Sequence, residues 1–293
     1  MTRQLAKKLG IAVVLALGVL QLQAFSPLRA HGDGNPSPPD EEGGLELPMG
    51  TRPRRQGPPF AITQGSLNQA VGFYSHGSLV NASAFPLGGD GFLKILRPRN
   101  RKYGTFDIRA VVEIAAAMLR HDFPGGERIQ IGDVAQKLGG SIGHISHENG
   151  LDADIVYLRE NHEEQAPNYI APTPTGFGEL FVTDTGASIS PNFDVERNWE
   201  FVKDLHSTGR IVRIFMDSVI KVTLCQYARR IGEYDTETDV LRRIRPLSNH
   251  RDHMHVRITC PDNSPDCQAQ EDPPLGSGCD EVLATPPDRF AAD

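Results

Sequence analysis

Hydrophobic residues in the middle of the chain recur with two different periods, which predicts a mixture of helices and strands. Spacings of three and four residues, typical of amphipathic helices, occur in three segments: 107–119, 199–209 and 217–230. Runs that alternate or are rich in β-branched residues predict strands in four segments: 91–96, 151–158, 210–216 and 254–259. The segment "RIQIGDVAQKLGG", residues 128–140, predicts a strand and then a short helix between its Gly-Asp and Gly-Gly pairs.

These elements follow one another in a mixed order, with few strand–helix–strand units of the parallel type. Such an order favours an α+β fold: a single domain, residues 61–261, with a central, mainly antiparallel sheet flanked by helices. Residues 31–60 are rich in proline, glycine and charge, which predicts a flexible arm. Whether that arm inhibits, tethers or spaces the domain stays open. Residues 262–293 predict a C-terminal tail tethered by disulfides.

The first thirty residues have a composition of their own. Three basic residues precede an uncharged apolar run, residues 11–20, which is too short to span a bilayer. A positive start, a short apolar stretch and small residues before a cleavage site are typical of a secretory signal. Residues 1–30 therefore predict a signal peptide, cleaved after Ala24 or Ala30, and an exported protein without a membrane span.

Charge excludes one class of partner. Residues 1–30 contain four basic residues and no acidic one, so their removal leaves 26 basic against 37 acidic residues and a formal charge of −11. Nucleic-acid binding depends on a basic surface, and we expect none here. The chain also has no Walker-type phosphate loop.

All four cysteines lie in the last quarter of the chain: Cys225, Cys260, Cys267 and Cys279. An even number in an exported protein favours two disulfides, for which three pairings exist. The short loop between Cys260 and Cys267 makes that pair plausible, and Cys225 would then pair with Cys279. A zinc site made of these cysteines is disfavoured, because the close C-x-x-C pairs that such sites use are missing.

Histidines gather in two short segments about a hundred residues apart. In "NHRDHMHVRITCP", residues 249–261, His253 and His255 have the two-residue spacing that places side chains on one face of a strand. Met254 and Val256 then face the other side, where they can enter the core. The strand therefore predicts two imidazoles that are held side by side on a rigid element.

The other segment is "GGSIGHISHENGLDADIVYL", residues 139–158. His147 precedes an Asn-Gly turn, and Asp152 and Asp154 follow it on one face of a predicted strand. A histidine before a turn and an aspartate after it can converge on one point. His147, Asp154 and one of the two strand histidines would supply three ligands and leave a fourth position open, as in a catalytic zinc site.

Zinc bound in this way would acidify a water molecule, and a neighbouring histidine could accept the proton. His255 would be the third ligand and His253 the base, or the reverse; the spacing does not decide between them. A structural zinc site is the alternative, and it would predict four protein ligands with no open position.

The two segments together resemble the signature motifs of the penicillin-insensitive murein endopeptidases. These belong to a zinc peptidase group that includes lysostaphin-type enzymes, D-Ala-D-Ala carboxypeptidases and the hedgehog signalling domain. The group pattern, H-x6-D followed downstream by H-x-H, is matched by His147, Asp154, His253 and His255, and the narrower family adds histidines matched by His144 and His250. The resemblance covers about residues 64–280. Glu148 and Ser78 depart from it, since the family often has glutamine and cysteine at these positions.

The resemblance implies a role for each of these residues and a hedgehog/D-Ala-D-Ala peptidase-like fold. His147, Asp154 and His255 would be the metal ligands of one zinc ion per chain, with His253 as the general base. His250 would stabilise the oxyanion or position the substrate. His144 and Asp152 would be supporting residues that orient the ligands. The resemblance also supports the pairing of Cys225 with Cys279 and of Cys260 with Cys267.

By the same resemblance, the protein is expected to be a periplasmic zinc metalloendopeptidase, insensitive to penicillin. Its substrates would be the peptide cross-links of peptidoglycan, with the D-alanyl-meso-diaminopimelate bond as the expected target. The alternative within the group is a zinc D,D- or L,D-carboxypeptidase that trims stem peptides. A third hypothesis, from another class, is a wall-binding protein with structural zinc. Neither the preferred cross-link nor the existence of a homodimer follows from the sequence.

Overall fold

The computed structural model describes residues 67–183 and 188–284. The predicted signal peptide, the predicted arm and the last nine residues of the predicted tail lie outside the described residues. The helices are η1 (Arg97–Arg99), α1 (Phe106–Asp122), α2 (Val195–Ser207), α3 (Ser218–Arg230), α4 (Thr238–Arg243) and α5 (Cys279–Ala284). The strands are β1 (Gln69–Phe73), β2 (His76–Val80), β3 (Ser83–Ala84), β4 (Gly88–Gly89), β5 (Phe92–Lys94), β6 (Tyr103–Gly104), β7 (Ile129–Ile131), β8 (Asp152–Val156), β9 (Ile211–Met216), β10 (Ile244–Pro246) and β11 (His253–Ile258).

A seven-stranded sheet in the order β10-β9-β11-β8-β7-β5-β4 forms the centre of the fold. The β10–β9 and β7–β5 pairs are parallel, and the remaining four pairs are antiparallel. The sheet is therefore mainly antiparallel and the fold is mixed α+β, as predicted. Strand β11, which carries the H-x-H motif, lies between β9 and β8 near the middle of the sheet.

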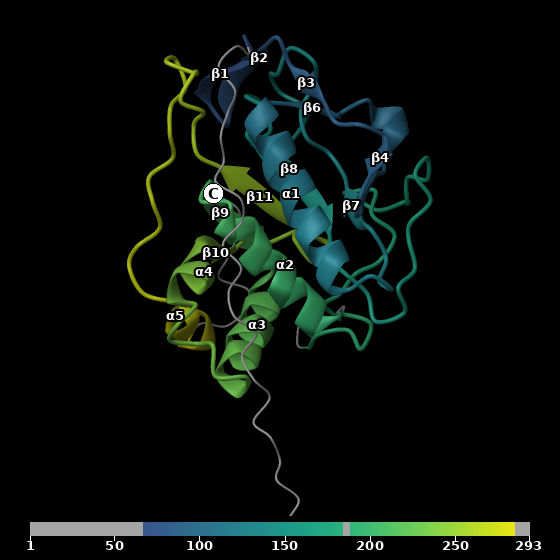
Figure 1. Cartoon of the computed structure of the whole chain (residues 1–293), viewed down its shortest axis with the longest axis vertical. Helices are drawn as coiled ribbons and strands as arrows, with labels where there is room; N and C mark the ends of the chain where they lie inside the picture. The colour runs from purple at the N-terminus through teal and green to yellow at the C-terminus, as the bar shows by residue number, and fades with distance from the viewer. Residues whose placement is uncertain (1–66, 184–187, 285–293) are drawn as a thin grey trace, which may run out of the picture. The chain divides into compact units, whose positions relative to one another are not determined.

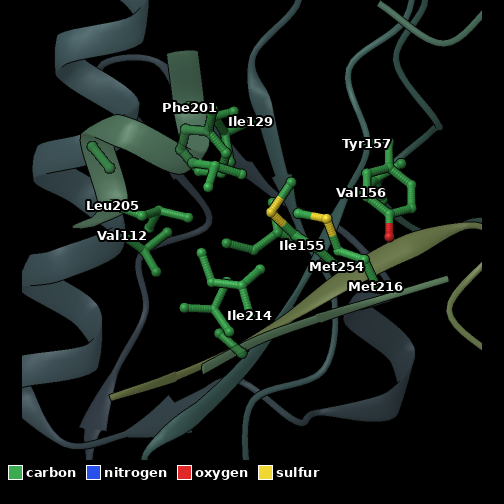
Figure 2. Packing of buried hydrophobic residues seen from close by; sticks show 14 of the residues in the cluster. Val112, Ile129, Ile155, Val156, Tyr157, Phe201, Leu205, Ile214, Met216 and Met254 are labelled. Carbon is green, nitrogen blue, oxygen red and sulfur yellow. The ribbon is translucent and has the colours of Figure 1, made fainter. Parts of the chain in front are cut away.

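Helices α1 and α2 pack against each other (Figure 1), and α1 also contacts β5 and β11. Their apolar faces and one face of the sheet form the hydrophobic core. Figure 2 shows Met254 of β11 packed beside Ile155 of β8 and Met216 of β9. Met254 and Val256 are fully buried, which confirms that this side of β11 enters the core.

The three long helices start at capping residues. Thr105 precedes α1, and its side chain accepts a hydrogen bond from the Ile108 backbone N–H. Asp194 and Asp217 cap α2 and α3 in the same way. Such a cap contributes about 1 kcal/mol, because it satisfies a donor that has no partner within the helix. Thr105 is therefore the residue that caps α1.

The helix predicted within 132–140 is wrong. Gly132, Val134 and Ala135 donate their backbone N–H groups to carbonyls of other segments rather than to one another. Asp133 does not cap a helix, since its carboxylate accepts hydrogen bonds from Arg99 and Arg101. The Gly-Asp pair starts no helix because its hydrogen-bond partners come from elsewhere in the chain.

Two disulfides join Cys225 to Cys279 and Cys260 to Cys267, the pairs that were predicted. The first ties α3 to α5, and the second closes a short loop after β11. Within the described residues, no helix is long and apolar enough to cross a membrane.

Lys221 in α3 is a buried cation, and this makes the stability of the fold depend on pH. Its Nζ donates to the Ile244 carbonyl at 2.9 Å, and burial lowers its pKa from 10.5 to about 7. Between these values the unfolded state binds more protons than the folded state, so stability rises with pH. The slope from this group is at most about 1.4 kcal/mol per pH unit.

We expect Lys221→Met to remove this contribution. The variant should be most stable relative to wild type near pH 6, and should lose that advantage by about pH 9.5, when Lys221 is neutral in the folded state. Urea unfolding of both proteins at the two pH values measures the difference. The exposed Lys137→Met serves as the control, and an equal pH dependence for both variants would contradict the prediction.

Candidate functional site

The pairing of β8 with β11 brings the two histidine segments together. Its antiparallel register places Asp154 opposite His255, and Asp152 opposite Arg257. These side chains lie on the face of the sheet opposite the core, because Met254 and Val256 occupy the other face. The two segments therefore meet through ordinary strand pairing.

His147 lies in the loop before β8, in a backbone conformation that non-glycine residues seldom adopt, with φ of 73°. Its backbone N–H donates to Asp152 Oδ2 at 3.2 Å. The loop is fixed from its other side by Gly139, which has a φ of +71°; a Cβ there would lie 2.1 Å from the Glu148 carbonyl oxygen. A strained backbone of this kind persists only where surrounding contacts hold it. Here these contacts place the His147 ring against Asp154.

Three imidazoles surround one oxygen of Asp154. Asp154 Oδ1 lies 3.2 Å from His147 Nε2, 3.3 Å from His255 Nδ1 and 3.6 Å from His253 Nε2. Asp154 is 2% exposed, and His147 is fully buried. All three predicted metal ligands and the predicted base are thus within one small volume.

Several of these atoms have no hydrogen-bond partner among the described residues. They are Asp154 Oδ1 and both ring nitrogens of His147. Buried polar atoms without partners are costly, and each needs an explanation. The donor types are those that bind zinc, and a cation at this point would satisfy atoms from both residues.

His144 is a second histidine beside this point. Ligand atoms of His144, His147 and Asp154 all lie within 4.8 Å of one another. The His144 side chain is 34% exposed, however, and its Nε2 lies 3.4 Å from an Arg101 guanidinium nitrogen. The described residues therefore offer two ligand sets, which share His147 and Asp154 and differ in using His255 or His144.

His255 is oriented by Asp152. Asp152 Oδ1 accepts a hydrogen bond from His255 Nε2 at 2.8 Å and one from Arg257 Nε at 2.6 Å. Since Nε2 is the donor, the lone pair of a neutral His255 lies on Nδ1, the nitrogen that faces Asp154. A carboxylate behind a histidine in this way is typical of metal sites, where it fixes the tautomer and the ring.

His253 has a carboxylate partner of its own that the sequence analysis missed. Asp252 Oδ1 lies 2.6 Å from His253 Nδ1, and Asp252 Oδ2 accepts a hydrogen bond from the Thr175 hydroxyl. The ring of Phe177 packs on His253 with ring centroids 4.8 Å apart. Asp252 stands next to the motif, but Thr175 and Phe177 belong to a segment without any recognisable pattern.

His250 lies beside His253, with ring centroids 4.9 Å apart. Its Nδ1 donates to the Ser248 carbonyl at 2.8 Å, which leaves Nε2 as an acceptor when the ring is neutral. Burial, together with the neighbouring His253 and His255, lowers the pKa of His250 to about 3. His250 is therefore neutral at physiological pH.

The remaining groups form an electrostatically coupled cluster. Burial would lower the pKa of His147, but the carboxylate of Asp154 outweighs burial and raises the pKa to about 9. Burial would raise the pKa of Asp154, yet His147 and His253 hold it well below the ordinary value. For Asp152, Arg257 is the main group that outweighs burial and lowers the pKa. Both carboxylates therefore stay ionised and attract positive charge.

The cluster lies in a cleft with a volume of about 760 Å³. This size is within the range of sites that bind small ligands or peptide segments. Its wall includes His144, Asp154, His250, His253 and His255. The cleft is also lined by Pro174, Thr175, Leu247 and Gln270. Several separate segments can therefore contact a bound chain.

Comparison with known proteins agrees with these observations. Residues 70–289 match the family model described as penicillin-insensitive murein endopeptidase. A protein of that name from Haemophilus influenzae is 33% identical over 215 residues, 73% of this chain and 71% of the relative. Another from Pectobacterium atrosepticum is 29% identical over 219 residues, 74% of each chain. The chain therefore belongs to the penicillin-insensitive murein endopeptidase family.

Proposed function

We propose that the protein is a zinc-dependent endopeptidase that hydrolyses the peptide cross-links of peptidoglycan. The observation that carries this proposal is the convergence of three imidazole nitrogens on the buried Asp154 Oδ1, at the wall of a cleft. Membership of the family supports the same activity. The D-alanyl-meso-diaminopimelate bond is the proposed target, and the periplasm, reached by a cleaved signal peptide, is the proposed location.

The proposed ligands of one zinc ion per chain are His147, Asp154 and His255. His255 is preferred over His144 because Asp152 already holds its Nε2, so that Nδ1 faces the ligand cluster, whereas His144 is partly exposed beside a cation. Zinc bound here would supply Lewis-acid polarisation of the scissile carbonyl and would acidify a water molecule.

His253 is proposed to accept the proton of the attacking water and to pass it to the leaving amine. Its Nε2 faces the ligand cluster, and its Nδ1 is held by Asp252. Proton transfer by a positioned side chain of this kind contributes about 10²–10⁴ in rate. Direct attack by water forms no acyl-enzyme, so a penicillin, which acylates a serine nucleophile, would have no target.

His250 is proposed to position the substrate. Of the two roles that the family resemblance implied, the stabilisation of an oxyanion needs a donor, whereas the neutral His250 presents an acceptor at Nε2. It could accept a hydrogen bond from a backbone N–H of the substrate.

Analysis of muropeptides tests the proposed function. The purified protein with zinc should convert cross-linked dimers to monomers and leave the terminal D-alanine of monomers in place. A chelator should abolish this conversion, and added zinc should restore it. Release of D-alanine from monomers without cleavage of dimers would favour the carboxypeptidase alternative. Zinc binding without either reaction would favour a wall-binding protein.

A further inference from the structure

Asp252 is held in one orientation by two donors. It is 3% exposed, its Oδ1 lies 2.6 Å from His253 Nδ1, and its Oδ2 accepts a hydrogen bond from Thr175. The adjacent Arg251 turns away, with its Nε 3.5 Å from Asp217 Oδ2. Both oxygens of a buried carboxylate are thus engaged by defined groups, and neither is free to change partner.

This arrangement selects one tautomer of His253. An ionised carboxylate only accepts hydrogen bonds, so the nitrogen that faces Asp252 must carry a proton. In a neutral ring the lone pair then lies on Nε2, the nitrogen that faces Asp154 across 3.6 Å. The nitrogen able to accept a proton is therefore the one turned toward the ligand cluster.

The ring is also held by packing. Phe177, which is 2% exposed, lies against His253 with an angle of 35° between the rings. Phe177 packs so closely on Gly132 that a Cβ there would lie 2.4 Å from its ring. The same short segment supplies Thr175 and Phe177, so it fixes both the carboxylate and the face of the imidazole.

We propose that Asp252 is a positioning residue for the reaction, which fixes the tautomer and the direction of the His253 ring, and that Thr175 fixes Asp252. This inference rests on the function proposed above. The inference assigns different roles to two carboxylates with similar surroundings. Asp152 orients a proposed metal ligand, whereas Asp252 orients the proposed base. Loss of Asp152 should weaken zinc binding, and loss of Asp252 should slow the reaction with zinc in place.

Asp252→Asn is the decisive variant. If the Thr175 hydroxyl donates to the single acceptor of the new amide, the NH₂ group faces Nδ1 and moves the imidazole proton to Nε2. We expect kcat for dimer cleavage to fall by about 10²–10⁴, with KM unchanged and one zinc ion per chain retained. Asp152→Asn should instead lower zinc affinity by about 10–100-fold. The exposed Asp235→Asn serves as the control for changes unrelated to the site.

Nitrogen-15 NMR of the imidazoles supplies a measurement independent of activity. The wild type should show His253 protonated at Nδ1, and Asp252→Asn should show it protonated at Nε2. Thr175→Val, which removes one hydroxyl, should lower kcat by about tenfold and provides the test if the amide variant does not fold.

Three results would overturn the inference: full kcat in Asp252→Asn, loss of its zinc, or wild-type His253 protonated at Nε2. A wild-type protein that binds zinc but leaves dimers uncleaved would refute the proposed function instead. The NMR experiment would then still decide whether Asp252 sets the tautomer.

Discussion

Replacement of His255 by alanine is expected to lower zinc affinity by more than 100-fold, whereas replacement of His144 should lower it by about tenfold or less. The reason is the difference in their surroundings. His255 Nδ1 faces Asp154 at 3.3 Å with its other nitrogen held by Asp152, while His144 is partly exposed and lies beside Arg101. Loss of a residue that only orients a ligand lowers metal affinity by about 10–100-fold, so loss of the ligand itself should lower it more.

Zinc content after dialysis, together with competition against a chelator, measures both variants. Dimer cleavage should fall with zinc occupancy in His255→Ala and should be restored in part by excess zinc. A His144→Ala protein that lost its zinc while His255→Ala kept it would assign the third ligand to His144. The exposed His121→Ala is the matched control, since its ring lies outside the cluster.

His253→Ala should separate catalysis from metal binding. We expect it to retain one zinc ion per chain and to lose about 10²–10⁴ in kcat, the range typical of a missing general base. KM should change little, because the proton transfer occurs only in the transition state. Steady-state kinetics on purified dimers and metal analysis of the same sample test both parts. A variant that lost zinc would make His253 a ligand, and one with wild-type kcat would exclude it as the base.

The strands that carry the site could be predicted from sequence because their pattern is local. Met254 and Val256 alternate with His253 and His255, and this alternation alone indicates which side chains enter the core. The pairing of β8 with β11, and its register with Asp154 opposite His255, are visible only in the structure.

The contacts behind the site could not be predicted because they join distant segments. Thr175 reaches Asp252 across 77 positions, and the segment that contains it has neither helical nor strand periodicity. Asp252 and Arg251 are adjacent in the sequence, but only the Asp252 side chain turns inward. No local rule distinguishes which of the two does so. The helix predicted in 132–140 is wrong for the same reason. Asp133 accepts hydrogen bonds from Arg99 and Arg101 instead of capping a helix.

The alternation in β11 has a consequence for how this protein can evolve. A strand that slips by one residue exchanges its two faces, so Met254 and Val256 would enter the cleft while imidazoles would be driven into hydrocarbon surroundings. An insertion or deletion of a single codon between positions 253 and 256 would therefore disturb the core and the site in one event. Length variation among descendants of this chain should be confined to loops away from that strand.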